Sequence, residues 1–269
     1  MKHIWIIGLN TFHEAIRRKF QMVLFIAAPA IIAAGTFFTY MEPGAEGKML
    51  ISFGMGAILI FGLLIAVFMG TSLIPSEVER RTIFTILSKP VRRGEFLLGK
   101  LLGASMTIVA NVFVMSVIFL VVLLYKTWGV DAVDSSLLFT NVAKALILFC
   151  VQFIVLVSIA IAISTVGSTV FNIIFTFIVF VIGVGSDSIS NMIKRHGEAE
   201  GGGILLQGVL KAIYWIVPHF SNFDIRASIT SDPPKFVPPA DVVWPIVYAV
   251  VYMAAVMLLA WLAFRDREF

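Results

Sequence analysis

Long charge-free apolar stretches recur along this chain and are separated by shorter polar segments. A helix needs about 20 predominantly apolar residues to cross the hydrocarbon core of a bilayer. The pattern therefore predicts an all-α integral membrane protein, with a single membrane domain over residues 1–269. We expect six membrane-spanning helices, at residues 20–41, 49–75, 95–125, 137–163, 168–189 and 242–264.

The fourth and fifth predicted spans share one charge-free run, residues 145–186, which is too long for a single crossing. Small polar residues cluster densely at 164–169 within that run. Because such clusters mark turns, we place a tight hairpin there.

The first residues, 1–19, predict an amphipathic helix in the inner membrane interface rather than a span. Trp5 and Phe12 fall on its apolar face, and Glu14 and Arg17 fall on the opposite face, with Arg18 next to them. An amphipathic helix of this kind lies in the interface, and a Trp anchors it at the level of the headgroups.

A long extracytoplasmic loop, residues 190–241, is expected before the last span. Within it, residues 204–217 form an apolar stretch that is too short to cross the membrane and fits a re-entrant or interfacial helix. Gln207 and Lys211 lie four residues apart and so on one helical face, which favours a helix lying at the membrane surface.

Composition and charge agree with a membrane protein and set its orientation. The chain is 59% hydrophobic and 13% charged, whereas soluble domains contain about 25% charged residues. It has no basic stripe interleaved with aromatic residues, so we exclude a nucleic-acid partner. Most of its 20 Lys and Arg residues lie on the side of the membrane that holds both termini. The positive-inside rule therefore predicts cytoplasmic termini and an even number of spans.

The loop between the second and third predicted spans is the most informative segment. Ser76 and Glu79 have the spacing of a capping box, and Pro90 ends the helical pattern, so we predict a short cytoplasmic helix at 76–89. Phe84 and Leu87 are among its apolar residues. Such a helix can lie on the membrane surface or in a groove on a partner protein, and the residues alone leave both alternatives open.

The stretch from Glu77 to Gly103 resembles the loop that is typical of permeases of the type-2 ABC transporter family. Glu77 and Glu79 match the acidic start of the family pattern, and Thr82, Pro90, Arg93 and the sequence Leu98-Gly99-Lys100 match its later positions. The family usually has Gly before the Thr, where this chain has Arg81. The amphipathic N-terminal helix, the six spans and the long segment before the last span extend the resemblance over essentially the whole chain.

The resemblance implies that the loop helix docks on a separate ABC ATPase and couples ATP hydrolysis to the membrane helices. The residues expected to make this contact are Glu77, Glu79, Arg80, Arg81, Thr82, Phe84, Leu87, Pro90 and Arg93. It further implies a second permease copy, in a homo- or heterodimer, and location in the bacterial inner membrane. ATP and magnesium would be bound by the partner ATPase, and this chain would bind no cofactor of its own.

No residue pattern indicates that this chain is itself an enzyme. Residues 94–100 have the spacing of a phosphate-binding loop, but Leu101 stands where that loop needs Ser or Thr. The four His residues are scattered, so we expect no metal site. His219 and Asp224 can meet a polar substrate at the outer mouth, although hydrated loop residues are the simpler interpretation.

Three polar residues inside the spans, Asn111, Gln152 and Asn172, are candidates to line a transport pathway. Polar groups in spans also join helices by hydrogen bonds, which is the commoner role. The predicted function is therefore export of a lipid-like, amphipathic or peptide substrate. One alternative is a membrane subunit, coupled to an ATPase, that supports assembly of an envelope enzyme without export. The other alternative is a secondary transporter or channel. Such a protein should show charges inside its spans or an internal repeat, and the sequence shows neither.

Overall fold

The computed structural model describes residues 2–38, 46–73, 92–127, 135–198, 204–231 and 235–265. All regular structure in these ranges is helical. The long helices are α1 (Lys2–Ile16), α2 (Lys19–Phe38), α3 (Glu46–Ser72), α6 (Arg93–Thr127), α7 (Ser135–Ser164), α8 (Thr169–Val184), α9 (Ser186–Glu198), α10 (Ile204–Ile216) and α12 (Ala240–Arg265). Two single-turn elements, η2 (Phe220–Phe223) and α11 (Arg226–Ile229), lie between α10 and α12.

Four of these helices, α3, α6, α7 and α12, are long and apolar enough to cross a membrane. Two bent pairs also qualify when each pair counts as one crossing: α1 with α2, bent by 69°, and α8 with α9, bent by 57°. The described residues thus contain four to six candidate spans, which overlap the six segments expected from the sequence.

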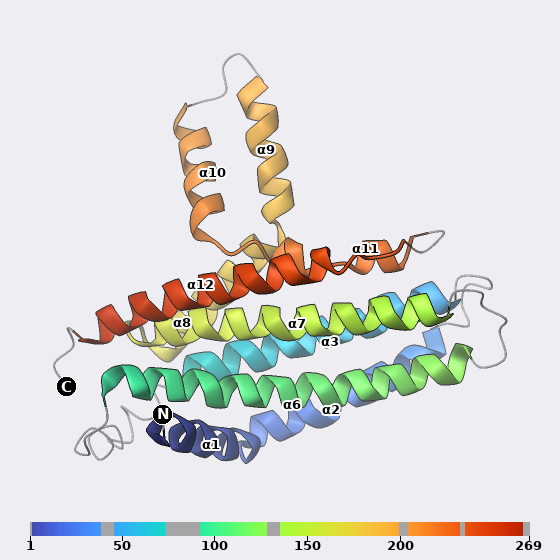
Figure 1. The fold of residues 1–269 in the computed structure, drawn as a ribbon, viewed down its shortest axis with the longest axis horizontal. Helices are drawn as coiled ribbons and strands as arrows, with labels where there is room; N and C mark the ends of the chain where they lie inside the picture. The colour runs from blue at the N-terminus through green and yellow to red at the C-terminus, as the bar shows by residue number, and fades with distance from the viewer. Residues whose placement is uncertain are drawn as a thin grey trace.

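Apart from α9 and α10, the long helices run side by side, and the start of α1 and the end of α12 lie at the same end of the bundle (Figure 1). The chain reverses between the last residue of α7, Ser164, and the first residue of α8, Thr169. The Ser164 hydroxyl donates to the carbonyl oxygen of Ile161 at 2.7 Å, and the Gly167 N–H donates to that of Ile163 at 3.0 Å. These bonds use carbonyl groups that the helix end would otherwise leave without partners.

The structure differs from the sequence expectation at the fifth segment, 168–189, which is not one continuous helix. α8 ends at Val184, Gly185 forms the break, and α9 begins at Ser186. The break falls where the apolar run meets Asp187, the first charged residue after α8. α9 and α10 then project from the bundle as a pair (Figure 1). The expected loop at 190–241 therefore contains part of α9, η2 and α11, as well as the expected short helix.

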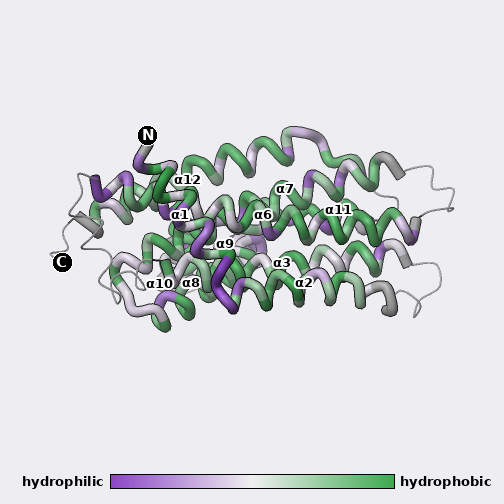
Figure 2. The backbone as a smooth tube through the Cα atoms, turned by 90° about the horizontal axis from the view of Figure 1, so that it is seen from below, coloured by the Kyte–Doolittle hydropathy of each residue, from purple (hydrophilic) through white to green (hydrophobic). Residues whose placement is uncertain are grey.

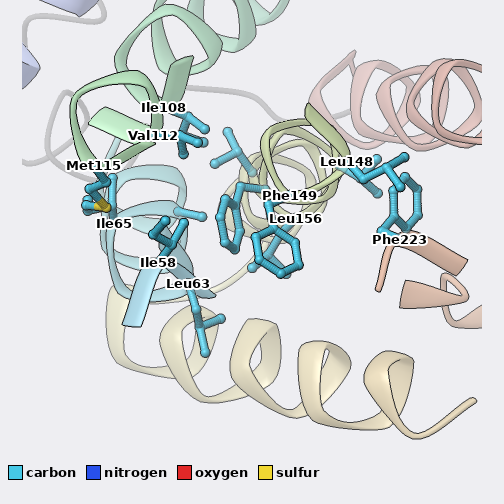
Figure 3. Close-up of a cluster of buried hydrophobic side chains, with 14 of the residues drawn as sticks. Ile58, Leu63, Ile65, Ile108, Val112, Met115, Leu148, Phe149, Leu156 and Phe223 are labelled. Atoms are coloured by element: carbon cyan, nitrogen blue, oxygen red, sulfur yellow. The ribbon is translucent and has the colours of Figure 1, made fainter. Parts of the chain in front are cut away.

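The core of the bundle lies between α3, α6 and α7. Ile58 of α3, Ile108 of α6 and Phe149 of α7 are at most 1% exposed and belong to one apolar cluster. Figure 3 shows these side chains meeting, with Leu148 of α7 beside Phe223 of η2 on the other side of α7. α7 thereby joins the bundle to the segment between α10 and α12.

The outer surface of the bundle is strongly apolar. Phe113 on α6, Phe171 on α8 and Val251 on α12 are each more than half exposed. Figure 2 shows hydrophobic residues along every long bundle helix, whereas α9 carries a hydrophilic stretch. Such a surface would drive a water-soluble monomer to associate, but it suits helices that face lipid.

The N-terminal helix α1 packs lengthwise against the first half of α6. The contact is made by small residues: Gly8 and Thr11 on α1 face Gly99 and Gly103 on α6, and Thr11 is 1% exposed. Trp5, in contrast, is 54% exposed and turned away from the protein. Small residues spaced four apart let two helix backbones approach closely, which explains this contact.

Candidate functional site

A cavity of about 390 Å³ lies where α8 meets α9, and we call it the junction cavity. It is bounded by α3, α7, the α8–α9 break, η2 and the start of α11. Its apolar lining includes Phe220, which is fully buried. Its polar lining residues are Ser52, Gln152, Asp187, Ser221, Asp224 and Arg226.

Asp224 and Arg226 form a tight ion pair on one wall of the junction cavity. The Arg226 Nε donates to both carboxylate oxygens, at 2.8 and 3.0 Å, and Nη2 donates to Oδ2 at 2.5 Å. The Arg226 guanidinium also lies 5.9 Å from the centre of the Phe149 ring. Both charged side chains are about 30% exposed. The hydrogen bonds hold the pair in one geometry, and its two charges cancel.

The pKa values of this pair move in the directions that favour its charged form. Burial raises the pKa of the Asp224 carboxyl, but hydrogen bonds from the side chain and backbone of Arg226 outweigh burial and lower it. The hydrogen bonds to Asp224 raise the pKa of Arg226, against the opposing effect of burial. Both groups therefore stay ionised and cancel each other's charge.

Asp187 supplies a second carboxylate that no cation balances within the cavity lining. It stands in the first turn of α9, where the helix dipole stabilises a negative charge. Its Oδ1 accepts a hydrogen bond from the Ser221 hydroxyl at 3.0 Å, and that hydroxyl lies 2.7 Å from the Ser186 hydroxyl. With Asp224 paired to Arg226, the cavity lining carries one net negative charge.

Gln152 brings an uncompensated polar group to the same cavity from the middle of α7. Its side chain lines the cavity and is 1% exposed, and its amide oxygen has no hydrogen-bond partner in the described part of the chain. A buried polar atom without a partner costs about 1–3 kcal/mol, so native structures rarely retain one without a reason.

The segment that carries the cavity wall is fastened to α12. The backbone N–H of His219 donates to the Tyr248 hydroxyl at 3.1 Å, and the Tyr252 hydroxyl donates to the carbonyl oxygen of Ile216 at 2.9 Å. Burial lowers the pKa of His219, an effect that the negative charge of Asp187 partly offsets. The imidazole is thus favoured in its neutral form beside the cavity.

The residues expected to contact an ATPase lie mostly outside the described ranges. Of that set, Arg93 is described and stands in the first turn of α6, half-buried. Just before it, the backbone N–H of Arg92 donates to the Glu95 carboxylate at 3.3 Å. Residues 94–100 form part of α6 rather than the strand-to-helix loop that binds a nucleotide phosphate.

Residues of the N-terminal helix lie at the corner between α1 and α2. Arg18 pairs with Glu14 at 3.0 Å, and its Nη1 donates to the Ser72 hydroxyl at the end of α3 at 2.6 Å. Phe12 lines a shallow apolar groove against α6, and Arg17 is exposed. Arg18 therefore ties the N-terminal helix to the last turn of α3.

The three candidate pathway residues are all buried in the bundle, but they are not gathered at one place. Asn111 donates to the carbonyl oxygen of Thr107 on its own helix at 2.7 Å, and Asn172 donates to that of Gly167 beside the α7–α8 turn at 3.3 Å. Gln152 lines the junction cavity together with Asp224. Their role in transport stays a prediction.

Sequence reasoning missed most of the junction cavity. It singled out Gln152 and Asp224 separately, but not Asp187, Ser221 or Arg226. A usable signal existed for Asp187, the first charge after the apolar run that forms α8. Among the described residues, no group of three or more His, Cys, Asp and Glu side chains has the arrangement of a metal site.

Comparison with known protein families gives one match. The family described as ABC-2 family transporter protein matches residues 6–269, nearly the full chain. The comparison with curated proteins found no matching relative.

Proposed function

Because the chain belongs to the ABC-2 family of transporter proteins, we propose that it is the membrane-spanning permease subunit of an ATP-driven exporter. The ATPase is a separate chain, and this subunit moves the substrate across the membrane. The observation that carries the proposal is the family match over residues 6–269. The helical bundle, with four to six candidate spans and an apolar surface, supports it.

In the proposed topology the chain crosses the bacterial inner membrane six times. The bent pairs α1–α2 and α8–α9 then contribute one crossing each, through α2 and α8. The start of α1 and the end of α12 lie at one end of the bundle (Figure 1), which we place in the cytoplasm because the sequence assigns most basic residues to the side of the termini.

The described parts of the chain suit the proposed coupling to an ATPase. The segment at 74–91, which carries Glu77 and all the other expected contact residues except Arg93, joins the end of α3 to the start of α6 in the sequence. Arg18 fastens the end of α3 to the α1–α2 corner, and α1 packs along α6. A push on the loop would therefore move α3, α6 and α1 as one unit.

The proposed exporter contains two permease copies and two ATPase subunits. Closing of the ATPases on ATP would shift the permease pair between inward-open and outward-open states, as binding shifts any two-state equilibrium. ATP and magnesium belong to the ATPase in this scheme. The cargo we propose is lipid-like, amphipathic or peptidic.

Co-purification tests the proposal directly. The tagged chain is purified in mild detergent with its candidate ATPase, and the wild type is compared with Glu77→Lys. We expect the wild type to retain the ATPase and the variant to lose it. Asp241→Lys is the matched control, because this exposed residue stands at the opposite end of the bundle, at the start of α12. A wild-type chain that retains no ATPase with or without nucleotide contradicts the proposal.

A further inference from the structure

The junction cavity combines two features: a buried acceptor that has no donor among the described residues, and a negative charge that no cation of the cavity lining balances. The acceptor is the Gln152 amide oxygen, which has no partner although the side chain is 1% exposed. The charge is that of Asp187, since Asp224 is paired with Arg226. We propose that this cavity binds the primary ammonium group of a ligand.

The charge balance selects a cation over an anion. The lining carboxylates are Asp187 and Asp224, and the lining cation is Arg226, which leaves one net negative charge. An anion would meet that charge, and Arg226 already directs Nε and Nη2 at Asp224. A monovalent cation brings the lining to neutrality, so that burial of its charge is compensated.

The type of cation follows from the acceptors. A primary ammonium has three N–H donors, which suit the Gln152 oxygen and the Asp187 carboxylate. A quaternary ammonium has no N–H group and would leave the Gln152 oxygen without a partner.

The cavity volume allows a small molecule or the headgroup of a larger one. At about 390 Å³ it lies in the range of ordinary ligand sites, about 300–1,000 Å³. The ammonium can therefore come from a free amine or from an aminophospholipid of the surrounding leaflet. The inference rests on the proposed function only in identifying this ligand as the cargo, because binding can be measured on the full chain without the ATPase.

The experiment measures ligand-dependent thermal stability of the full chain in nanodiscs. In one arm the nanodiscs contain only phosphatidylcholine, and ethanolamine, choline or acetate is titrated in. In the other arm phosphatidylethanolamine replaces part of the phosphatidylcholine, with no free amine added. A ligand that binds only the folded chain raises the melting temperature. The increase grows with the logarithm of the ratio of ligand concentration to Kd.

We expect ethanolamine, phosphatidylethanolamine or both to raise the melting temperature, and the responding arm identifies the source of the ammonium group. Choline and acetate should give no comparable shift. Equal protection by choline, or no protection by either amine source, overturns the proposal. ATPase stimulation by the same amine in the complete transporter is a separate measurement, and its failure would count against the cargo role while leaving the binding site intact.

Variants separate ligand recognition from a structural role. Gln152→Leu and Asp187→Asn should each weaken amine binding about tenfold or more, because the first removes an acceptor for the charged donor and the second removes the negative charge that balances the cation. Gln152→Leu should leave the ligand-free melting temperature unchanged or higher, since it also removes a buried atom without a partner. Asp241→Asn is the control, with wild-type affinity expected. Wild-type affinity in both cavity variants overturns the proposal.

Discussion

The backbone oxygen of Gly8 on α1 lies 2.5 Å from the position that a Cβ atom on Gly103 of α6 would occupy. Real Cβ atoms do not approach a carbonyl oxygen this closely, so the two helices are in contact because residue 103 has no side chain. The same holds at Gly99, where a Cβ atom would come within 2.7 Å of Ile7.

Gly103→Leu should therefore detach or displace α1 from α6. Overpacking of a tight contact costs about 1–3 kcal/mol, and here the obstacle is backbone rather than a movable side chain. Cross-linking between cysteines placed on the exposed sides of α1 and α6 measures the displacement. Gly56→Leu on α3 is the control, because nothing lies within 4 Å of its Cβ position. Equal cross-linking in Gly103→Leu and the wild type would show that α1 does not need this close approach.

Arg226→Met should destabilise the segment around the junction cavity. The substitution leaves the Asp224 carboxylate partly buried without its cation, which costs about 3–5 kcal/mol at fully buried sites. The pair is about 30% exposed, so we expect a smaller loss, about 1–3 kcal/mol. Thermal unfolding in nanodiscs gives the measurement. The double variant Asp224→Asn/Arg226→Met should recover most of the loss. If its loss of stability instead equals the sum of the losses in the two single variants, the two residues are not coupled.

Lowering the pH should weaken the attachment of the segment around His219 to Tyr248 of α12. Its folded-state pKa lies below its ordinary value of 6.5 because burial disfavours the charged ring. Protonation therefore favours the unfolded chain, so the contribution of His219 is complete above pH 6.5 and falls as the pH drops below it. The protection factors of the amides in residues 217–225, which correct for the slower intrinsic exchange at low pH, should fall between pH 8 and pH 5.5. His219→Gln should reduce this dependence, and His13→Gln, at an exposed site on α1, should leave it intact.

Arg18→Gln should reduce coupling to the ATPase more than stability, if the proposed function holds. Its ion pair with Glu14 is partly exposed, and such pairs contribute only about 0.2–1 kcal/mol. The bond to Ser72, however, joins the N-terminal helix to the end of α3, which directly precedes residues 74–91 in the sequence. Substrate-stimulated ATPase activity of the complete transporter measures the effect. Arg17→Gln, at the neighbouring exposed position, is the matched control. Equal activity in both variants would rule out a role for Arg18 in coupling.

Much of the helical framework was predictable, because the ability of a segment to cross a membrane is a local property. Charge-free runs of sufficient length are visible in the sequence, and α3, α6, α7 and α12 occupy four of them. The turn between α7 and α8 falls within residues 164–169, where small polar residues interrupt the apolar run. The break at Gly185 was not predicted, because glycines in an apolar run, here Gly183 and Gly185, are compatible with a continuous helix.

The junction cavity depended on contacts between residues that are distant in the chain. Asp187, Asp224 and Gln152 come from three different elements, and their common position follows from the break after α8 and the return of η2 onto α7. Sequence alone therefore established the membrane environment, the helical spans and the resemblance to a transporter family, since these depend on composition, local periodicity and a contiguous motif. Tertiary structure alone determined which polar groups meet, which of their charges cancel and which acceptor has no donor, because these depend on how distant helices pack.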